Sequence, residues 1–214
     1  MIKVTDVVLD LIQTDELALE SLRAGLLNLS AFADKIHQRV ENATKKPVQK
    51  GTIVVALSRI TKHLPSAASL IPDISLTNIG IKSSLTVITY KKTVDTQRKI
   101  SVLNPFLLPI NDLFSVTEGP EEITVICSDR SKEIVLKNIG SKPEAEINGL
   151  VAVSVAFDKK YLDTPNVIYT LLSTLATKRI NIYELVSTYT ELSFIIKKED
   201  METAIKAMNV YFNK

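Results

Sequence analysis

Apolar residues in the first third of the chain recur at the three- and four-residue spacing of amphipathic helices. We expect one helix over about 6–24, a second that begins near Ser30, and a third from Gly51 to about His63. Ser30 is a good N-cap residue for the second helix. Two short helices joined by a turn, after a longer helix, predict a helix-turn-helix unit within a domain over 1–65.

The segment 66–82 is expected to be a linker or a wing strand. If the N-terminal domain is a winged helix, residues 73–89 can supply its wing. Residues 83–90 can equally open the next domain as a β-strand. The pattern leaves both alternatives open.

The rest of the chain repeats one order of elements at an interval of roughly 65 residues, strand, helix, hairpin and helix. This order is typical of ferredoxin-like βαββαβ units, so we expect one unit over 83–148 and another over 149–214. The predicted fold class is therefore α+β, with an N-terminal helical domain followed by tandem ferredoxin-like units. Expected are strands at 85–90 and 150–156, helices at 94–103, 132–138 and 165–177, hairpins at 113–126 and 180–196, and a last helix that buries Met201, Ile205, Met208 and Phe212.

The second unit has no sequence for its sixth element, because the last helix runs almost to Lys214. We expect the closing strand to come from another part of the chain, such as residues 73–80, or from a partner subunit. A sheet with an open edge invites pairing, so we also expect a homodimer.

Composition narrows the class of protein without naming a function. The net charge of +2 gives no general attraction to nucleic acid or anionic lipid. The single cysteine, Cys127, excludes an intrachain disulfide and a multi-cysteine metal site, and we expect it to be buried. The first residues lack the pattern of a signal peptide, and no stretch approaches the ~20 apolar residues of a membrane span. We therefore expect a soluble, cytoplasmic protein that does not bind membranes.

Motifs for catalysis are missing from the sequence. It contains no glycine-rich phosphate loop, no nucleophile elbow and no paired acids at a useful spacing. Its histidines, His37 and His63, lie far apart in the chain and without a cluster suited to zinc. We expect a protein that is not an enzyme and that needs neither a metal nor a cofactor.

Basic side chains gather in the second part of the N-terminal domain, where they could neutralise DNA phosphates. The third expected helix, however, has a single arginine over 52–59 and neither Asn nor Gln to read base edges. A packing or dimerisation domain with a solvated basic face is the alternative to DNA binding. The candidate DNA-contacting residues are Lys45, Lys46, Lys50, Arg59 and Lys62.

The segment 184–193 reads Glu-Leu-Val-Ser-Thr-Tyr-Thr-Glu-Leu-Ser. It resembles the ACT domains at the C-terminus of aspartate kinases, in which an acidic residue, two apolar residues and two Ser/Thr precede Ser-Glu-apolar-Ser. The match needs one inserted residue, around Tyr189. The resemblance covers about 149–212, and 83–139 more weakly, whereas the Lys-Phe/Tyr-Gly-Gly-Ser/Thr start of the kinase domain is absent.

The resemblance implies an amino-acid site built from two places. One is the turn between the first strand and the first helix, where Thr164 can cap the helix and Pro165 leaves backbone N–H groups free for a carboxylate. The family's glycine in this turn is missing. The other place is the segment that links the second and third strands. The residues implied for ligand binding are Asp163, Thr164, Asn166, Val167, Glu184, Thr188, Thr190 and Glu191.

Together these features predict a non-enzymatic regulatory protein that binds a small ligand, expected to be an amino acid. A shift between two arrangements of its units would make it allosteric. One alternative is an amino-acid-responsive transcription regulator that binds DNA through its N-terminal domain. The other is a purely structural dimerisation module.

Overall fold

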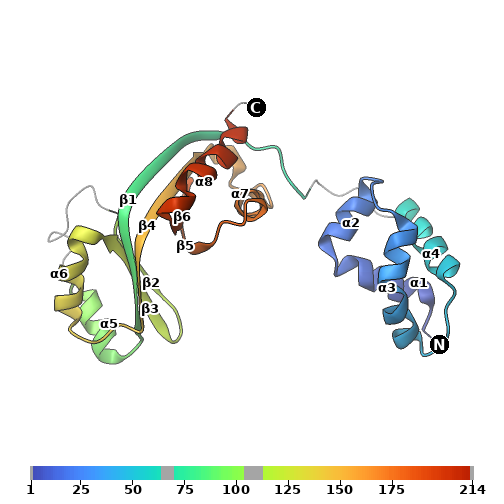
Figure 1. Ribbon diagram of the computed structural model, residues 1–214, viewed down its shortest axis with the longest axis horizontal. Helices are drawn as coiled ribbons and strands as arrows, with labels where there is room; N and C mark the ends of the chain where they lie inside the picture. The colour runs from blue at the N-terminus through green and yellow to red at the C-terminus, as the bar shows by residue number, and fades with distance from the viewer. Residues whose placement is uncertain (1, 64–69, 104–112, 213–214) are drawn as a thin grey trace. The chain divides into compact units, whose positions relative to one another are not determined.

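The computed structural model describes residues 2–63, 70–103 and 113–212. The chain forms two compact units, 1–70 and 71–214 (Figure 1). The start of the expected linker, residues 64–69, lies outside the described residues. Helices in the first unit and an antiparallel sheet with helices in the second confirm the α+β class.

The first unit consists of helices packed around one apolar core. The single helix expected over 6–24 is wrong, because the chain forms two helices there. Asp15 ends the run: its carboxylate Oδ1 accepts from Ala18 N–H at 3.1 Å and so caps a new helix. The helices are α1 (Val4–Gln13), α2 (Glu16–Arg23), α3 (Leu29–Thr44) and α4 (Lys50–His63).

The later helices of this unit lie close to the expected positions. Asn28, rather than Ser30, is the N-cap of α3, since its Oδ1 accepts from Ala31 N–H at 3.0 Å. Residues 45–49 connect α3 to α4. The helix-turn-helix assignment of this pair stays a prediction.

The described residues of the second unit form one sheet in the order β2-β3-β1-β4-β6-β5, with every pair antiparallel. Two long strands run through both halves of it (Figure 1). The strands are β1 (Leu76–Lys91), β2 (Ser115–Glu118), β3 (Glu122–Ser128), β4 (Ala145–Phe157), β5 (Ile182–Ser187) and β6 (Glu191–Lys197).

Strand β1 serves both halves of the sheet. Its first part, 76–82, pairs with β4 from Leu76 opposite Phe157 to Lys82 opposite Ala152. After a register shift, its second part, 85–91, pairs with both β3 and β4. The strand that closes the second half therefore comes from the residues before the first half, as one of our alternatives predicted.

Each half of the sheet has its own pair of helices. Helices α5 (Val94–Ser101) and α6 (Asp129–Ile139) pack against β1 and β3, in a core that contains the buried Cys127. Helices α7 (Val167–Thr177) and α8 (Met201–Met208) pack against β4 and β6. A different apolar cluster lies on the sheet face turned away from α7 and α8, and it includes Leu150, Ala152 and Ile195.

The end of the last helix departs from its predicted spacing. Phe212 was expected inward, yet it is partly exposed and the neighbouring Tyr211 is buried. The α-helix ends at Met208, and a 3-10 helix over Asn209–Tyr211 follows. A 3-10 helix has fewer residues per turn, so the inward position moves from residue 212 to residue 211. Among the described residues, no helix combines the length and apolar character that a membrane crossing requires.

Tyr90 carries a buried hydroxyl that finds no hydrogen-bond partner among the described residues. A buried hydroxyl without a hydrogen-bond partner costs free energy, so Tyr90→Phe is expected to raise the free energy of unfolding by about 1 kcal/mol.

The advantage of this variant should depend on pH. Burial, with smaller contributions from Cys127 and Glu146, raises the pKa of Tyr90 to about 12. The unfolded tyrosine titrates near 10, so the wild type loses stability between about pH 10 and 12. Urea unfolding at pH 8 and pH 11, followed by circular dichroism, should show the larger advantage of the variant at pH 11. Equal or lower stability of the variant would contradict the prediction.

Candidate functional site

A nine-residue loop, 158–166, joins β4 to α7. It begins with a short 3-10 helix, Lys159–Tyr161, which Asp158 caps by accepting from Lys160 N–H at 3.0 Å. The Tyr161 hydroxyl accepts from Ser75 N–H at 3.1 Å, and this bond lowers the pKa of Tyr161. The loop is thereby fastened to the residue that precedes β1.

Helix α7 begins later than the sequence predicted. Thr164 does not cap it, because Thr164 N–H donates to the Tyr161 carbonyl and extends the preceding turn. The N-cap is Asn166, in the left-handed region with φ 69°. Asparagine tolerates this conformation better than most residues. The Asn166 side chain makes no capping bond, so the first N–H groups of α7 stay available to a ligand carboxylate.

The turn between β5 and β6 lies beside this loop. Thr188 N–H donates to the Glu191 carbonyl at 2.9 Å and closes the turn. Phe157 N–H donates to the Thr190 carbonyl at 3.0 Å, which joins the turn to the end of β4. The Lys159 ammonium sits 5.7 Å from the centre of the Tyr189 ring. The Phe157–Thr190 backbone bond and the contact of Lys159 with Tyr189 thus hold the β5–β6 turn beside the 158–166 loop.

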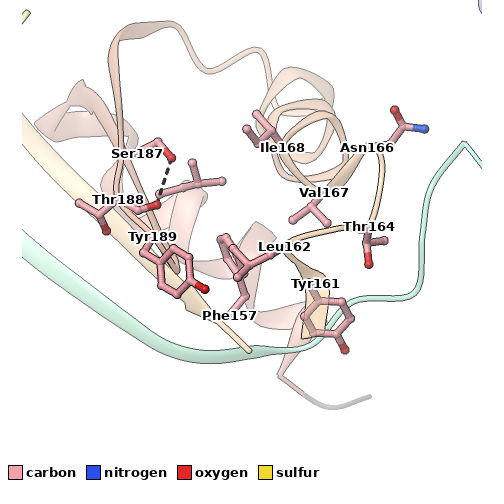
Figure 2. Close-up of a pocket in the computed structure, with 11 residues that line it drawn as sticks. Phe157, Tyr161, Leu162, Thr164, Asn166, Val167, Ile168, Ser187, Thr188 and Tyr189 are labelled. Carbon is pink, nitrogen blue, oxygen red and sulfur yellow. Dashed lines mark hydrogen bonds between the residues drawn. The ribbon is translucent and has the colours of Figure 1, made fainter. Parts of the chain in front are cut away.

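Between the loop, the start of α7 and this turn lies a cavity of about 570 Å³ (Figure 2). Its volume is within the range of small-molecule sites, ~300–1,000 Å³. In Figure 2 the hydroxyls of Ser187 and Thr188 lie on one side, and Thr164 and Asn166 on the other. Apolar side chains make up most of the remaining wall, namely Phe157, Tyr161, Leu162, Val167, Ile168 and Leu192, with Tyr189 beside the turn.

Four residues implied by the ACT resemblance line the cavity, and they come from both expected places: Thr164, Asn166, Val167 and Thr188. Asp163 and Thr190 lie next to lining residues in the chain without lining the cavity themselves. The structure thus brings the two expected places together, while ligand binding by these residues stays a prediction.

Glu184 and Glu191 face away from the cavity. Residues paired across strands share a sheet face, and Glu184 pairs with Ile195, which belongs to the cluster on the far face. Glu191 precedes the lining residue Leu192 and points to the opposite face, because side chains alternate along a strand. Burial raises the pKa of Glu184. We therefore leave both carboxylates outside the candidate site.

Sequence reasoning missed the apolar wall of the cavity. The residues implied by the resemblance did not include Phe157, Leu162 or Leu192, which the structure places in the cavity wall. The length of the 158–166 loop was a usable signal. A nine-residue connection between strand and helix has room for side chains such as Leu162, whereas a two-residue connection does not.

The chemistry of the cavity suits binding. The described residues that line it include no Asp, Glu, His, Lys or Arg beside the hydroxyls of Ser187 and Thr188. The described part of the chain also holds no cluster of three or more His, Cys, Asp or Glu suited to a metal ion.

The corresponding connection in the other half of the sheet is shorter and carries an ion pair. There only residues 92 and 93 join β1 to α5. The Lys92 ammonium lies 2.7 Å from Glu118 Oε1 and donates to the Gly119 carbonyl at 3.1 Å. The Gln97 amide donates to the same Glu118 oxygen at 2.7 Å. A partly exposed ion pair thus joins the β1–α5 connection to the end of β2 in this half.

The candidate DNA-contacting residues are spread along α4 rather than gathered. Lys45 and Lys46 lie in the connection before the helix, and Lys50 at its start pairs with Asp34 at 2.5 Å. Arg59 and Lys62 lie nearer its other end, about 14 and about 18 Å from Lys50 along the helix axis. Contact with DNA stays a prediction for these residues.

Comparison with known proteins connects this geometry to a family. Residues 147–209 match the family model of the ACT domain. No curated protein matches the chain significantly.

Among solved structures, the ligand-free regulatory subunit of aspartate kinase from Thermus thermophilus matches with a TM-score of 0.53 and 15% identity, over 64% of this chain and 99% of that subunit. The aspartate kinase of Clostridium acetobutylicum matches with a TM-score of 0.54 and 17% identity, over 66% of this chain and 36% of the kinase. Aspartokinase III of E. coli, in complex with aspartate and ADP, matches with a TM-score of 0.51 and 11% identity, over 66% of this chain and 34% of the kinase.

At these identities the likeness to solved structures shows the fold alone. The chain spans about a third of the length of the two complete kinases. Residues 147–209 match the ACT domain, and they lie within a sheet that has the fold of an aspartate kinase regulatory subunit.

Proposed function

We propose that this protein is a regulatory, non-enzymatic sensor that binds an amino acid in the cavity between the 158–166 loop and the β5–β6 turn. The observation that carries the proposal is the cavity itself, which lies within the ACT-matching segment. It joins uncapped helix N–H groups to a set of hydroxyls and an apolar wall. ACT domains serve regulation by binding small ligands, and that general role supports the proposal.

The two ends of an amino acid fit different parts of this cavity. The α-carboxylate would lie at the first turn of α7, where free N–H groups and the helix dipole favour a negative charge. The α-ammonium would donate to hydroxyl oxygens. The Ser187 hydroxyl donates its own proton to the Thr188 carbonyl at 3.3 Å, so its lone pairs can accept from a ligand (Figure 2).

The effect of ligand binding would reach the other half of the sheet through β1 and β4, the strands that both halves share. A ligand that orders the loop also acts on Tyr161, whose hydroxyl bonds to Ser75 just before β1. We propose that both halves are ACT-like units and that only the second binds ligand, because in the first half the strand-to-helix connection has two residues and carries the Lys92–Glu118 ion pair. Regulation would require two arrangements that differ in their affinity for the ligand.

A homodimer is part of the proposal. Strands β2 and β5 form the two edges of the sheet, and each presents a partly exposed apolar side chain, Val116 and Leu185 respectively. Edges of this kind favour pairing with a second copy.

Thermal unfolding in the presence of each of the twenty amino acids at millimolar concentration tests the sensor. An amino acid at ~100 times its dissociation constant should stabilise the protein by about 2.7 kcal/mol and raise its melting temperature. Leu162→Trp, which places an indole in the cavity, should abolish the rise. Glu191→Ala is the matched control, because Glu191 lies on the opposite face of the sheet, and it should keep the rise. The proposal fails if no amino acid raises the melting temperature. It also fails if Glu191→Ala removes the rise while Leu162→Trp leaves it intact.

A further inference from the structure

We infer that the amino acid bound in this cavity has an uncharged, apolar side chain, such as that of leucine, isoleucine, valine or methionine. This ligand class rests on the proposed function and narrows it. Three features of the cavity support it: a rigid apolar floor, exposed apolar side chains at its rim, and charges that are directed elsewhere.

The floor of the cavity consists of side chains that the core holds in place. Phe157, Val167 and Leu192 line the cavity and are also buried members of the core under α7 and α8. Their positions are fixed by packing on the side away from the cavity. A ligand side chain at this floor meets carbon atoms rather than polar groups.

The rim leaves apolar surface for a ligand to cover. Leu162 is 38% exposed and Ile168 is 45% exposed, and both line the cavity. Burial of apolar surface is favourable by about 25 cal/mol per Å². An apolar ligand side chain between them gains this free energy, whereas a charged side chain loses hydration there.

None of the described residues that line the cavity is charged. The Lys160 ammonium lies 4.9 Å from the centre of the Tyr161 ring, and Lys159 lies over Tyr189. Glu184 and Glu191 face the other side of the sheet. A lysine or arginine ligand would therefore find no carboxylate among the described lining residues, and an unpaired charge in such a site is costly.

Matched ligands test the class directly. L-norleucine and L-lysine have the same unbranched four-carbon side chain, to which lysine adds a terminal ammonium group. In calorimetric titrations of the full chain, norleucine, leucine and methionine should bind at least ~10-fold more tightly than lysine, aspartate or glutamate. Glutamine, nearly the same size as methionine, should also bind more weakly than methionine.

A charge placed in the cavity should reverse this preference. Leu162→Asp supplies the missing carboxylate, so we expect norleucine affinity to fall at least ~10-fold and lysine to become the better ligand. Val210→Asp is the matched control, because Val210 belongs to the same half, is exposed at 57% and does not line the cavity. It should keep the wild-type preference. Circular dichroism and the melting temperature without ligand verify that both variants are folded.

The outcomes separate the ligand class from the sensor itself. Tighter binding of lysine, aspartate or glutamate than of norleucine by the wild type overturns the apolar class and leaves the amino-acid sensor standing. Loss of the preference in Val210→Asp, with Leu162→Asp unchanged, also overturns the class, because the ligand then binds elsewhere. Binding of no amino acid by the folded wild type overturns the sensor as well.

Discussion

Replacing Phe194 with alanine is expected to lower the free energy of unfolding of the 71–214 unit by about 3–5 kcal/mol. The Phe194 side chain is fully buried on β6, opposite Val153 of β4, in the core beneath α7 and α8. Its removal takes away apolar burial and leaves a cavity that the strands cannot close. The loss is a large part of the stability of a typical domain.

Urea unfolding followed by tyrosine fluorescence measures this effect in the second unit alone. The chain has no tryptophan, and all six tyrosines lie after residue 71. Val210→Ala is the matched control, because Val210 belongs to the same half and is largely exposed, and it should change stability by less than about 0.5 kcal/mol. A similarly small loss in Phe194→Ala would show that the packing described for this core is incorrect.

Removing residues 71–83 from the second unit is expected to abolish its cooperative unfolding. These residues supply the strand that closes the half of the sheet containing the cavity, and with it the buried Ile74 and Leu76. The loss of two core side chains and a row of ladder hydrogen bonds amounts to about 5 kcal/mol or more, comparable to the stability of a whole domain.

Two fragments, 71–214 and 84–214, make the comparison. The first should unfold cooperatively in urea, and the second should lack the transition. A synthetic peptide of residues 71–83, added to the shorter fragment, should restore it by pairing with β4. Equal stability of the two fragments would mean that the closing strand is dispensable or is replaced by a second copy of the chain.

Most elements of the second unit were predictable because their signals are local. Alternating or continuous apolar runs such as 150–156 predict strands, and the spacing within 167–177 predicts a helix. The closing strand was also within reach, since a repeated element order with one strand missing requires a source for it. The order of pairing in the sheet was not predicted.

The predicted helix boundaries were wrong where a few hydrogen bonds decide between neighbouring capping residues. One bond at Asp15 divides the first helix in two. Thr164 looked like the cap of α7, but its N–H bonds to Tyr161 and the helix starts after Asn166. In each case the sequence contains more than one good capping residue. The backbone conformation in the folded protein decides which of them caps the helix.

The sequence by itself determined the α+β class, which follows from periodicity, and its resemblance to ACT domains indicated the two segments that meet at the cavity. Tertiary structure decided which side chains line the cavity. A register shift between Ile182 and Glu184 sets which β5 residues face α7, and it turns Glu184 to the far side. The nine-residue loop admits Leu162, whereas the short connection in the other half places Lys92 on Glu118. Strand register and the path of a loop depend on contacts between residues that are distant in the sequence. The local pattern of apolar and polar residues therefore does not predict them.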